Sequence, residues 1–196
     1  MSGAMLGDDS RHLTMTRIRT ALETGDTSIF HHDIWSQRRD DLDLSAPLDE
    51  RGRTLLMQAS QSGQAAFARA LVELGASVHQ RDVSGYTALL LARDCDTATV
   101  LLEAGARVNE AANNGVTALA IAAQRGELRL ARLFLSIGAD VDAPSRHGST
   151  PVMRAAERGH MHIVDLLLDA GADPFRRDRW GRTANDHLPG SMRSAA

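Results

Sequence analysis

The stretch TPVMRAAERGHMHIVDLLLDAGAD, from Thr150 to Asp173, repeats the landmarks of TALAIAAQRGELRLARLFLSIGAD, which begins 33 residues earlier at Thr117. Each stretch opens with Thr, carries Ala-Ala in its first half, has Gly in its middle and ends in Gly-Ala-Asp. The Gly two residues before each opening Thr recurs at 52, 85, 115, 148 and 181, so the period is 33 residues with a single interval of 30. A fixed period of this length is typical of solenoids, in which one small structural unit stacks on the next.

Each unit predicts two helices joined by a tight turn. Thr at 54, 87, 117 and 150 can cap a helix N-terminus with its hydroxyl, and Pro151 fits the first helical position. A short Gly turn follows, and then a second helix with apolar residues at helical spacing, as in Ile163, Leu166 and Leu167. The inward faces that pack one unit on the next are expected to include Leu56, Ala59, Leu71, Leu89, Ala92, Leu101, Leu119, Ala122, Leu133, Ala155, Val164 and Leu167.

Together these landmarks resemble the ankyrin repeat, over about Leu48 to Leu188. The turn sequences DERGRT, DVSGYT and DRWGRT and the ending LLLDAGAD carry the resemblance as much as the period does. It implies an all-α solenoid of stacked antiparallel helix pairs with protruding turn tips. The chain departs from the family where a His often stands in its Thr-Pro-Leu-His tetrapeptide, because those positions hold Met57, Leu90, Ala120 and Met153.

We expect one domain over residues 13–190. An N-terminal capping unit (13–47) precedes repeats at 48–80, 81–110, 111–143 and 144–176, and a partial C-terminal unit (177–190) closes the stack, since terminal units need a polar outer side. In the N-terminal unit, Ile18, Ala21 and Leu22 are expected to face inward from one helix, with Phe30 and Ile34 on another. Residues 1–12 and 191–196 are expected to be disordered.

The 30-residue interval falls in TALLLARDCDTATVLLEAGA, which begins at Thr87. Three missing residues amount to about 0.8 of a helical turn, so we expect the second helix to lose its first turn, with Asp96 as its cap. Two interpretations stay open. The deletion is either one tolerated at a loop, or it leaves a notch, lined by Arg93, Asp94 and Cys95, that admits a partner's side chain.

Nothing in the sequence predicts catalysis. The sequences HHD at 31–33 and HMH at 160–162 do not converge on one ion within a helix, and no phosphate-binding loop, Ser nucleophile elbow or zinc spacing is present. We therefore expect no enzyme activity, catalytic residue, cofactor or metal. The single cysteine, Cys95, excludes an internal disulfide, and no apolar run approaches the roughly 18 residues of a membrane span.

These features favour a cytoplasmic monomer that does not contact membranes, with secretion by a signal-less route left open. The basic residues are all arginine, which favours GC-rich coding, with selection for bidentate contacts to carboxylate or phosphate as the alternative. We expect a bacterial source.

What remains is surface, because stacking aligns the turn tips and the outer ends of the first helices into one extended strip. The only Tyr and one of the two Trp fall on it, and exposed Tyr, Trp and Arg are enriched in binding hot spots. The alternatives are that Trp180 only covers the last hydrophobic face and that Tyr86 only packs within its repeat. The residues that we assign to this strip are Arg51, Arg53, Tyr86, Asn113, Asn114, Gln124, Arg125, Arg146, His147, Arg158, Arg179, Trp180 and Arg182.

The leading hypothesis is a non-enzymatic module that binds another protein through the strip, as the resemblance implies. The alternative is a bacterial effector directed at a host, or a toxin-neutralising protein. A weaker alternative is an anion or nucleic-acid binder using Arg125, Arg146, Arg158, Arg179 and Arg182. A net charge of -3 argues against non-specific nucleic-acid binding, which needs many phosphate contacts.

Overall fold

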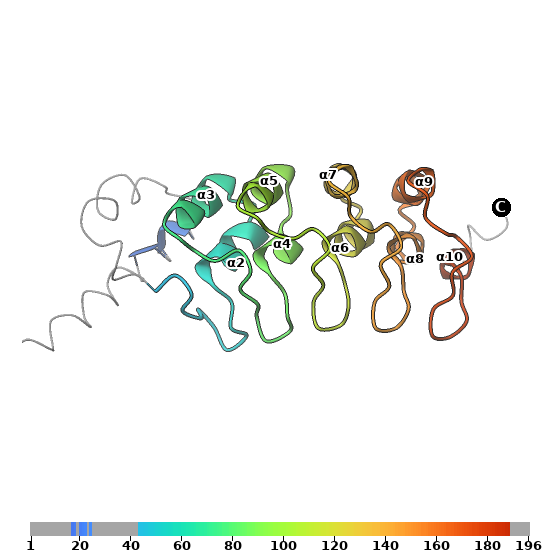
Figure 1. The fold of residues 1–196 in the computed structure, drawn as a ribbon, viewed down its shortest axis with the longest axis horizontal. Helices are drawn as coiled ribbons and strands as arrows, with labels where there is room; N and C mark the ends of the chain where they lie inside the picture. Colours follow the sequence, from blue (N-terminus) through green and yellow to red (C-terminus); the bar gives the residue numbers. More distant parts are fainter. Residues whose placement is uncertain (1–16, 19, 23, 25–42, 189–196) are drawn as a thin grey trace, which may run out of the picture.

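The computed structural model describes residues 17, 18, 20–22, 24 and 43–188. Their helices form two parallel layers, with a long loop extending from the first layer in every unit (Figure 1). The first layer contains α2 (Leu55–Gln61), α4 (Ala88–Leu91), α6 (Ala118–Arg125), α8 (Pro151–Glu157) and α10 (Ala184–His187). The second layer contains α3 (Ala65–Glu73), α5 (Cys95–Glu103), α7 (Leu128–Ser136) and α9 (Met161–Asp169).

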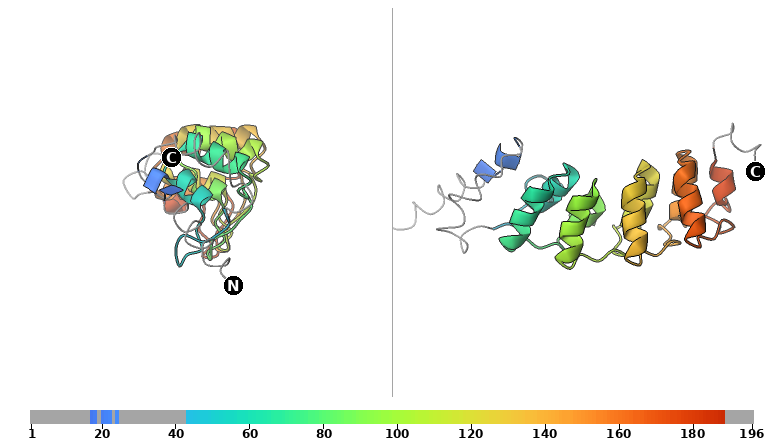
Figure 2. Two further views of the ribbon diagram at one scale, coloured as in Figure 1. Left: turned by 90° about the vertical axis from the view of Figure 1, so that its left-hand side faces the viewer. Right: turned by 90° about the horizontal axis from the view of Figure 1, so that it is seen from above.

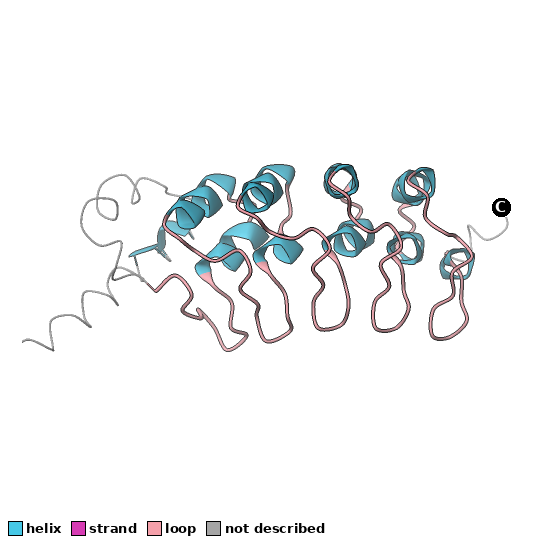
Figure 3. Cartoon of the chain, viewed as in Figure 1, coloured by secondary structure: helices cyan, strands magenta, loops and turns pink. Residues whose placement is uncertain are grey.

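The units follow one another along a single axis, so that α3, α5, α7 and α9 lie side by side when seen from above (Figure 2). The part of the chain that the structure describes has no strand, only one isolated antiparallel bridge between Ala111 and Thr117 (Figure 3). The predicted all-α solenoid of helix pairs is therefore confirmed.

Threonine opens the first helices, as predicted, but it does so in two ways. The hydroxyls of Thr54 and Thr117 accept hydrogen bonds from the N–H groups three residues later, at 3.3 and 3.4 Å. Thr87 and Thr150 take the same extended conformation without a side-chain cap bond. Pro151 occupies the first turn of α8, where its missing N–H costs no helical hydrogen bond.

One continuous apolar cluster runs through the stack and includes the predicted inward faces. Of the predicted set only Leu133 is not fully buried, and it still packs against the cluster. Met57, Leu90, Ala120 and Met153 are all buried, so apolar side chains occupy the positions where the family often has His.

The short repeat corrects the expectation about which helix is truncated. The second helix, α5, keeps nine residues, as do α3, α7 and α9, whereas the first helix, α4, has only four. Asp94, and not Asp96, caps α5, because its Oδ1 accepts a hydrogen bond from the Thr97 N–H at 2.8 Å. The deletion thus removes the end of a first helix.

At the two ends of the chain, the structure describes part of each predicted capping unit. Ile18, Ala21 and Leu22 are buried, and the Gln64 side-chain amide donates to the Leu22 carbonyl at 2.8 Å, which ties this segment to the first full repeat. Phe30, Ile34, the HHD sequence and the expected disordered segments 1–12 and 191–196 lie outside the described residues. In the C-terminal unit, Thr183 and Asp186 form a capping box that opens α10.

Candidate binding surface

The turn tips are the residues 49–53, 82–86, 112–116, 145–149 and 178–182, and a polar side chain at the base shapes most of them. In the second tip, Asp82 Oδ1 accepts hydrogen bonds from the N–H groups of Ser84 and Tyr86, at 2.9 and 2.8 Å. Asp49 and Asp178 do the same in the first and last tips. Asp side chains that bond the backbone two residues on stabilise tight turns, so these three tips are held in the same kind of turn.

The tips are also bonded to one another. In each of four hydrogen bonds, all 2.9 Å long, an N–H of one tip donates to a carbonyl of the tip before it. Gly115 shows how close the approach is, since its φ is +79° and a Cβ there would lie 2.8 Å from the Arg146 nitrogen. The tips therefore form a continuous row. The bonds run from Val83 to Arg51, from Asn113 to Ser84, from Arg146 to Asn114 and from Arg179 to His147.

At the C-terminal end of the row, Trp180 stands 60% exposed among cationic and aromatic neighbours. The guanidinium groups of Arg182 and Arg179 lie 4.8 and 5.4 Å from the centre of its ring, and the His147 ring lies 5.6 Å away. Arg179 Nη1 also lies 2.9 Å from His147 Nδ1. Trp180 therefore lies outside the apolar cluster, and its ring, flanked by Arg, is largely open to solvent.

Asp178 anchors this patch from below. Its side chain is fully buried and accepts hydrogen bonds from Arg182 Nε at 2.9 Å and from His187 Nε2 at 3.1 Å. Burial alone would raise the pKa of this carboxyl, but hydrogen bonds from Arg182, Trp180 and His187 outweigh it and lower the pKa to about 2. The ionised Asp178 thus joins the last tip to α10.

The centre of the strip is hollowed by a cavity of about 380 Å³, lined by Tyr86, Ile121, Gln124, Arg125 and Arg158. Tyr86 is half-buried and packs against the core, so intrarepeat packing is part of its role, but its side chain also reaches the cavity. The structure brings four predicted strip residues together here from three consecutive units.

Sequence reasoning missed Arg154, which lies beside this cavity. Its Nη1 donates to Gln124 Oε1 at 3.0 Å, while its buried Nε finds no hydrogen-bond partner in the described part of the chain. Burial lowers the pKa of this guanidinium. The sequence did contain a signal. Arg154 stands four residues after Thr150, and the same position one unit earlier holds the apolar Ile121, so the arginine departs from the apolar pattern.

The remaining strip residues divide between exposed and structural roles. Arg51 and Arg146 are exposed on their tips. The Arg53 side chain is held within the fold, because its Nη1 donates a hydrogen bond to Gln61 Oε1 at 2.8 Å. Asn113 and Asn114 support the row, because the Asn113 amide donates to the Val83 carbonyl and Asn114 Oδ1 accepts from the Val116 N–H. The strip is therefore three separate groups of side chains on one backbone row.

A second cavity, of about 550 Å³, lies at the short repeat, lined by residues 93–96 and 127–130. It includes Arg93, Asp94 and Cys95, the side chains predicted to line a notch. Asp94 is committed to Thr97, whose N–H and hydroxyl both donate to it. Burial raises the pKa of Glu127, and this effect outweighs the lowering by the nearby charges of Arg125 and Arg93.

The Cys95 thiol offers a test of this notch. Burial raises the pKa of Cys95, because the thiolate is poorly solvated there, and the effect outweighs that of Arg129. Since only the thiolate reacts, maleimide labelling at neutral pH is expected to be slower than for a solvent-exposed cysteine of pKa about 8.5, with its midpoint at higher pH. Labelling rates against pH for the folded and urea-unfolded chain measure this. A lower midpoint in the folded chain would contradict the burial of the thiol.

Within the described residues, no three His, Cys, Asp or Glu side chains gather closely enough to hold a metal ion. The helices found there are also too short or too polar to cross a bilayer.

Stacked helix pairs with a bonded row of tips define a helical repeat solenoid. The family model described as ankyrin repeats (3 copies) matches residues 20–112 and 93–178, and the chain therefore belongs to the ankyrin-repeat family. Comparison with curated proteins gave no match. Ankyrin repeats generally mediate binding to other proteins, and the family is typically non-enzymatic.

Proposed function

We propose that this chain is a non-enzymatic module that binds a partner protein through the strip. The observation that carries the proposal is the exposure of Trp180 between two guanidinium groups on a row of tips bonded backbone to backbone. With 60% of its surface exposed, the Trp180 ring leaves most of its apolar area free to contact a partner. Aromatic and Arg side chains on a rigid support are the usual centre of binding energy, because little conformational entropy is lost when they bind.

The first prediction is that Tyr86→Ala and Trp180→Ala each weaken partner binding at least about tenfold, which is about 1.4 kcal/mol. Each change removes a stiff side chain with a large contact area, Tyr86 from the central cavity and Trp180 from the last tip. Partners are captured with the full chain and identified, and their affinities for each variant are then measured by calorimetry. Thermal melting of each variant establishes that the fold is intact.

Arg132→Glu is the matched control, because Arg132 is exposed on α7 in the second helix layer. Its affinity for the partner is expected to stay within about twofold of the parent. Normal binding by both strip variants together with loss of binding in Arg132→Glu would move the binding site to the second layer.

A further inference from the structure

The cavity at the centre of the strip is built almost wholly from hydrogen-bond donors. Tyr86 comes from the second tip, Gln124 and Arg125 from the end of α6, and Arg158 from the end of α8. Ile121 supplies an apolar wall, and among the described residues those that line the cavity include no carboxylate. Its volume of about 380 Å³ lies within the range of roughly 300–1,000 Å³ of ligand pockets.

Gln124 is turned so that it adds a donor and not an acceptor. Its Oε1 accepts the hydrogen bond from Arg154 Nη1 at 3.0 Å, which leaves the amide NH₂ group to face other partners. Arg154, whose side chain is half-buried, thus places a positive charge on the carbonyl side of that amide. A hydrogen-bond acceptor bound in the cavity would therefore meet the Gln124 NH₂ group, which the positive charge of Arg154 makes a stronger donor.

The two arginines of the lining keep most of their donors available. Arg125 Nη1 lies 3.4 Å from the Ala92 carbonyl oxygen and 3.8 Å from Glu127 Oε1, both long for a hydrogen bond. Arg158 is exposed, and the described residues place no carboxylate oxygen within 4.0 Å of its guanidinium. A guanidinium carries five N–H donors in a planar fork that matches a carboxylate.

Charge is unevenly divided between the two helix layers. The first layer and its tips, residues 48–62, 81–93, 111–125, 144–158 and 177–188, hold eleven arginines and six carboxylates. One of those carboxylates, Asp178, is buried and bonded within the fold. The second helices and the loops that follow them, residues 65–78, 95–109, 127–142 and 161–176, hold five arginines and nine carboxylates. An acidic partner is therefore attracted to the strip and repelled from the opposite face.

We propose that the cavity lined by Tyr86, Gln124, Arg125 and Arg158 binds a carboxylate side chain from an acidic segment of the partner protein. The inference rests on the proposed function and adds the chemistry of the bound group. A nucleic acid fits less well, because a run of regularly spaced phosphates needs an extended basic face, whereas these donors converge on one cavity and the second layer is acidic.

The test uses the full chain and a fluorescein-labelled peptide of alternating Glu and Ala, with an otherwise identical peptide of alternating Gln and Ala. Fluorescence anisotropy is expected to show binding of the Glu peptide and at least about tenfold weaker binding of the Gln peptide. Arg158→Gln, an exposed change that removes the guanidinium but keeps a polar side chain, is expected to weaken binding of the Glu peptide about tenfold. Tyr86→Phe removes only the phenolic hydroxyl and is expected to weaken it as well.

Arg132→Gln is the matched control, since Arg132 is an exposed arginine on α7 that lines neither cavity. It is expected to leave binding of the Glu peptide unchanged. Equal binding of the Glu and Gln peptides, no binding of the Glu peptide, or an Arg158→Gln variant that binds like the parent would overturn the inference. Tighter binding of a labelled single-stranded oligonucleotide than of the Glu peptide would overturn it in favour of phosphate.

The same variants separate this inference from the proposed function. A captured partner that loses affinity in Trp180→Ala but not in Arg158→Gln overturns the carboxylate site alone. A partner whose affinity is unchanged in every strip variant overturns both.

Discussion

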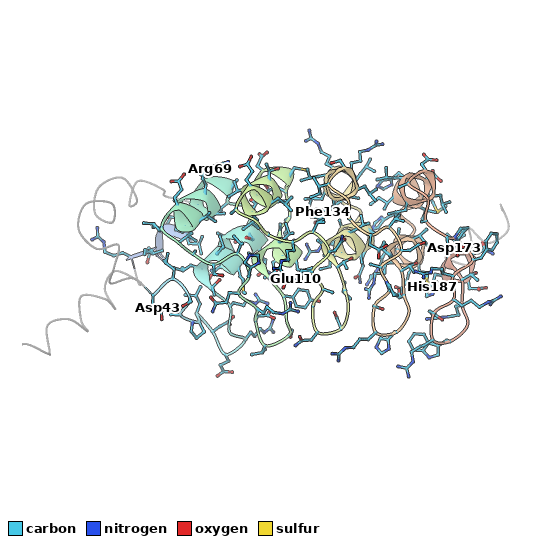
Figure 4. All side chains as sticks on the ribbon, viewed as in Figure 1. Asp43, Arg69, Glu110, Phe134, Asp173 and His187 are labelled. Atoms are coloured by element: carbon cyan, nitrogen blue, oxygen red, sulfur yellow. The ribbon has the colours of Figure 1, made fainter. Side chains whose placement is uncertain are left out.

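Phe134→Ala is expected to lower the free energy of unfolding by about 3–5 kcal/mol, the range found when a buried aromatic ring is removed from a core. Phe134 lies on α7 between the two helix layers and is 2% exposed (Figure 4). Urea unfolding followed by circular dichroism measures the change.

Arg132→Ala is the control for this prediction, because it shortens an exposed side chain on the same helix. Its effect is expected to stay within about 0.5 kcal/mol. A loss of less than about 1 kcal/mol in Phe134→Ala would show that the ring contributes little to packing between the layers.

The repeat register alone was enough to predict the helix pairs and the buried faces. Each inward side chain lies at a fixed offset from a Thr or Gly whose chemistry is local, as the left-handed φ of +78° at Gly126 between α6 and α7 illustrates. Local signals of this kind act within one unit and recur in the next. The helices and buried positions of one regular unit therefore predict those of the other regular units.

The short repeat shows where local reasoning stops. The missing residues could shorten either helix, and the count of residues does not distinguish them. Shortening α5 would remove its buried Thr97 and Ala98, whereas shortening α4 removes only the outer end of a first helix. Asp94 then provides a cap at the new boundary. The choice depends on packing against the neighbouring units, which the spacing of one unit does not contain.

The strip was predicted as a set of positions, but not as groups of side chains in contact. Arg154 was missed because the two preceding units hold Leu91 and Ile121 at its register, which makes the position look apolar. Its contact with Gln124 joins residues 30 positions apart on adjacent helices. Such pairs become visible only when neighbouring units are placed against each other.

Asp178→Ala is expected to lower the free energy of unfolding by about 2–3 kcal/mol, since hydrogen bonds to a charged group contribute about 1.5–3 kcal/mol and their donors would be left without an acceptor. The carboxylate accepts hydrogen bonds from the backbone N–H groups of Trp180 and Arg182 and from the side chains of Arg182 and His187, and so holds the last tip against α10. The exposed Asp165→Ala on α9 is the matched control and is expected to change stability by no more than about 0.5 kcal/mol. Urea unfolding near neutral pH provides the comparison.

The pH dependence identifies the ionised carboxyl as the source of this stability. The pKa of Asp178 in the folded chain is about 2, below the value of about 3.9 expected when the chain is unfolded. A lowered folded pKa means that the contribution is complete above about pH 5 and is lost as the pH falls towards 2. The difference in unfolding free energy between the parent and Asp178→Asn, which keeps the shape but not the charge, is therefore expected to be largest near neutral pH and to shrink in acid. A difference of the same size at both ends of that range would show that shape and hydrogen bonding, and not ionisation, hold the last tip in place.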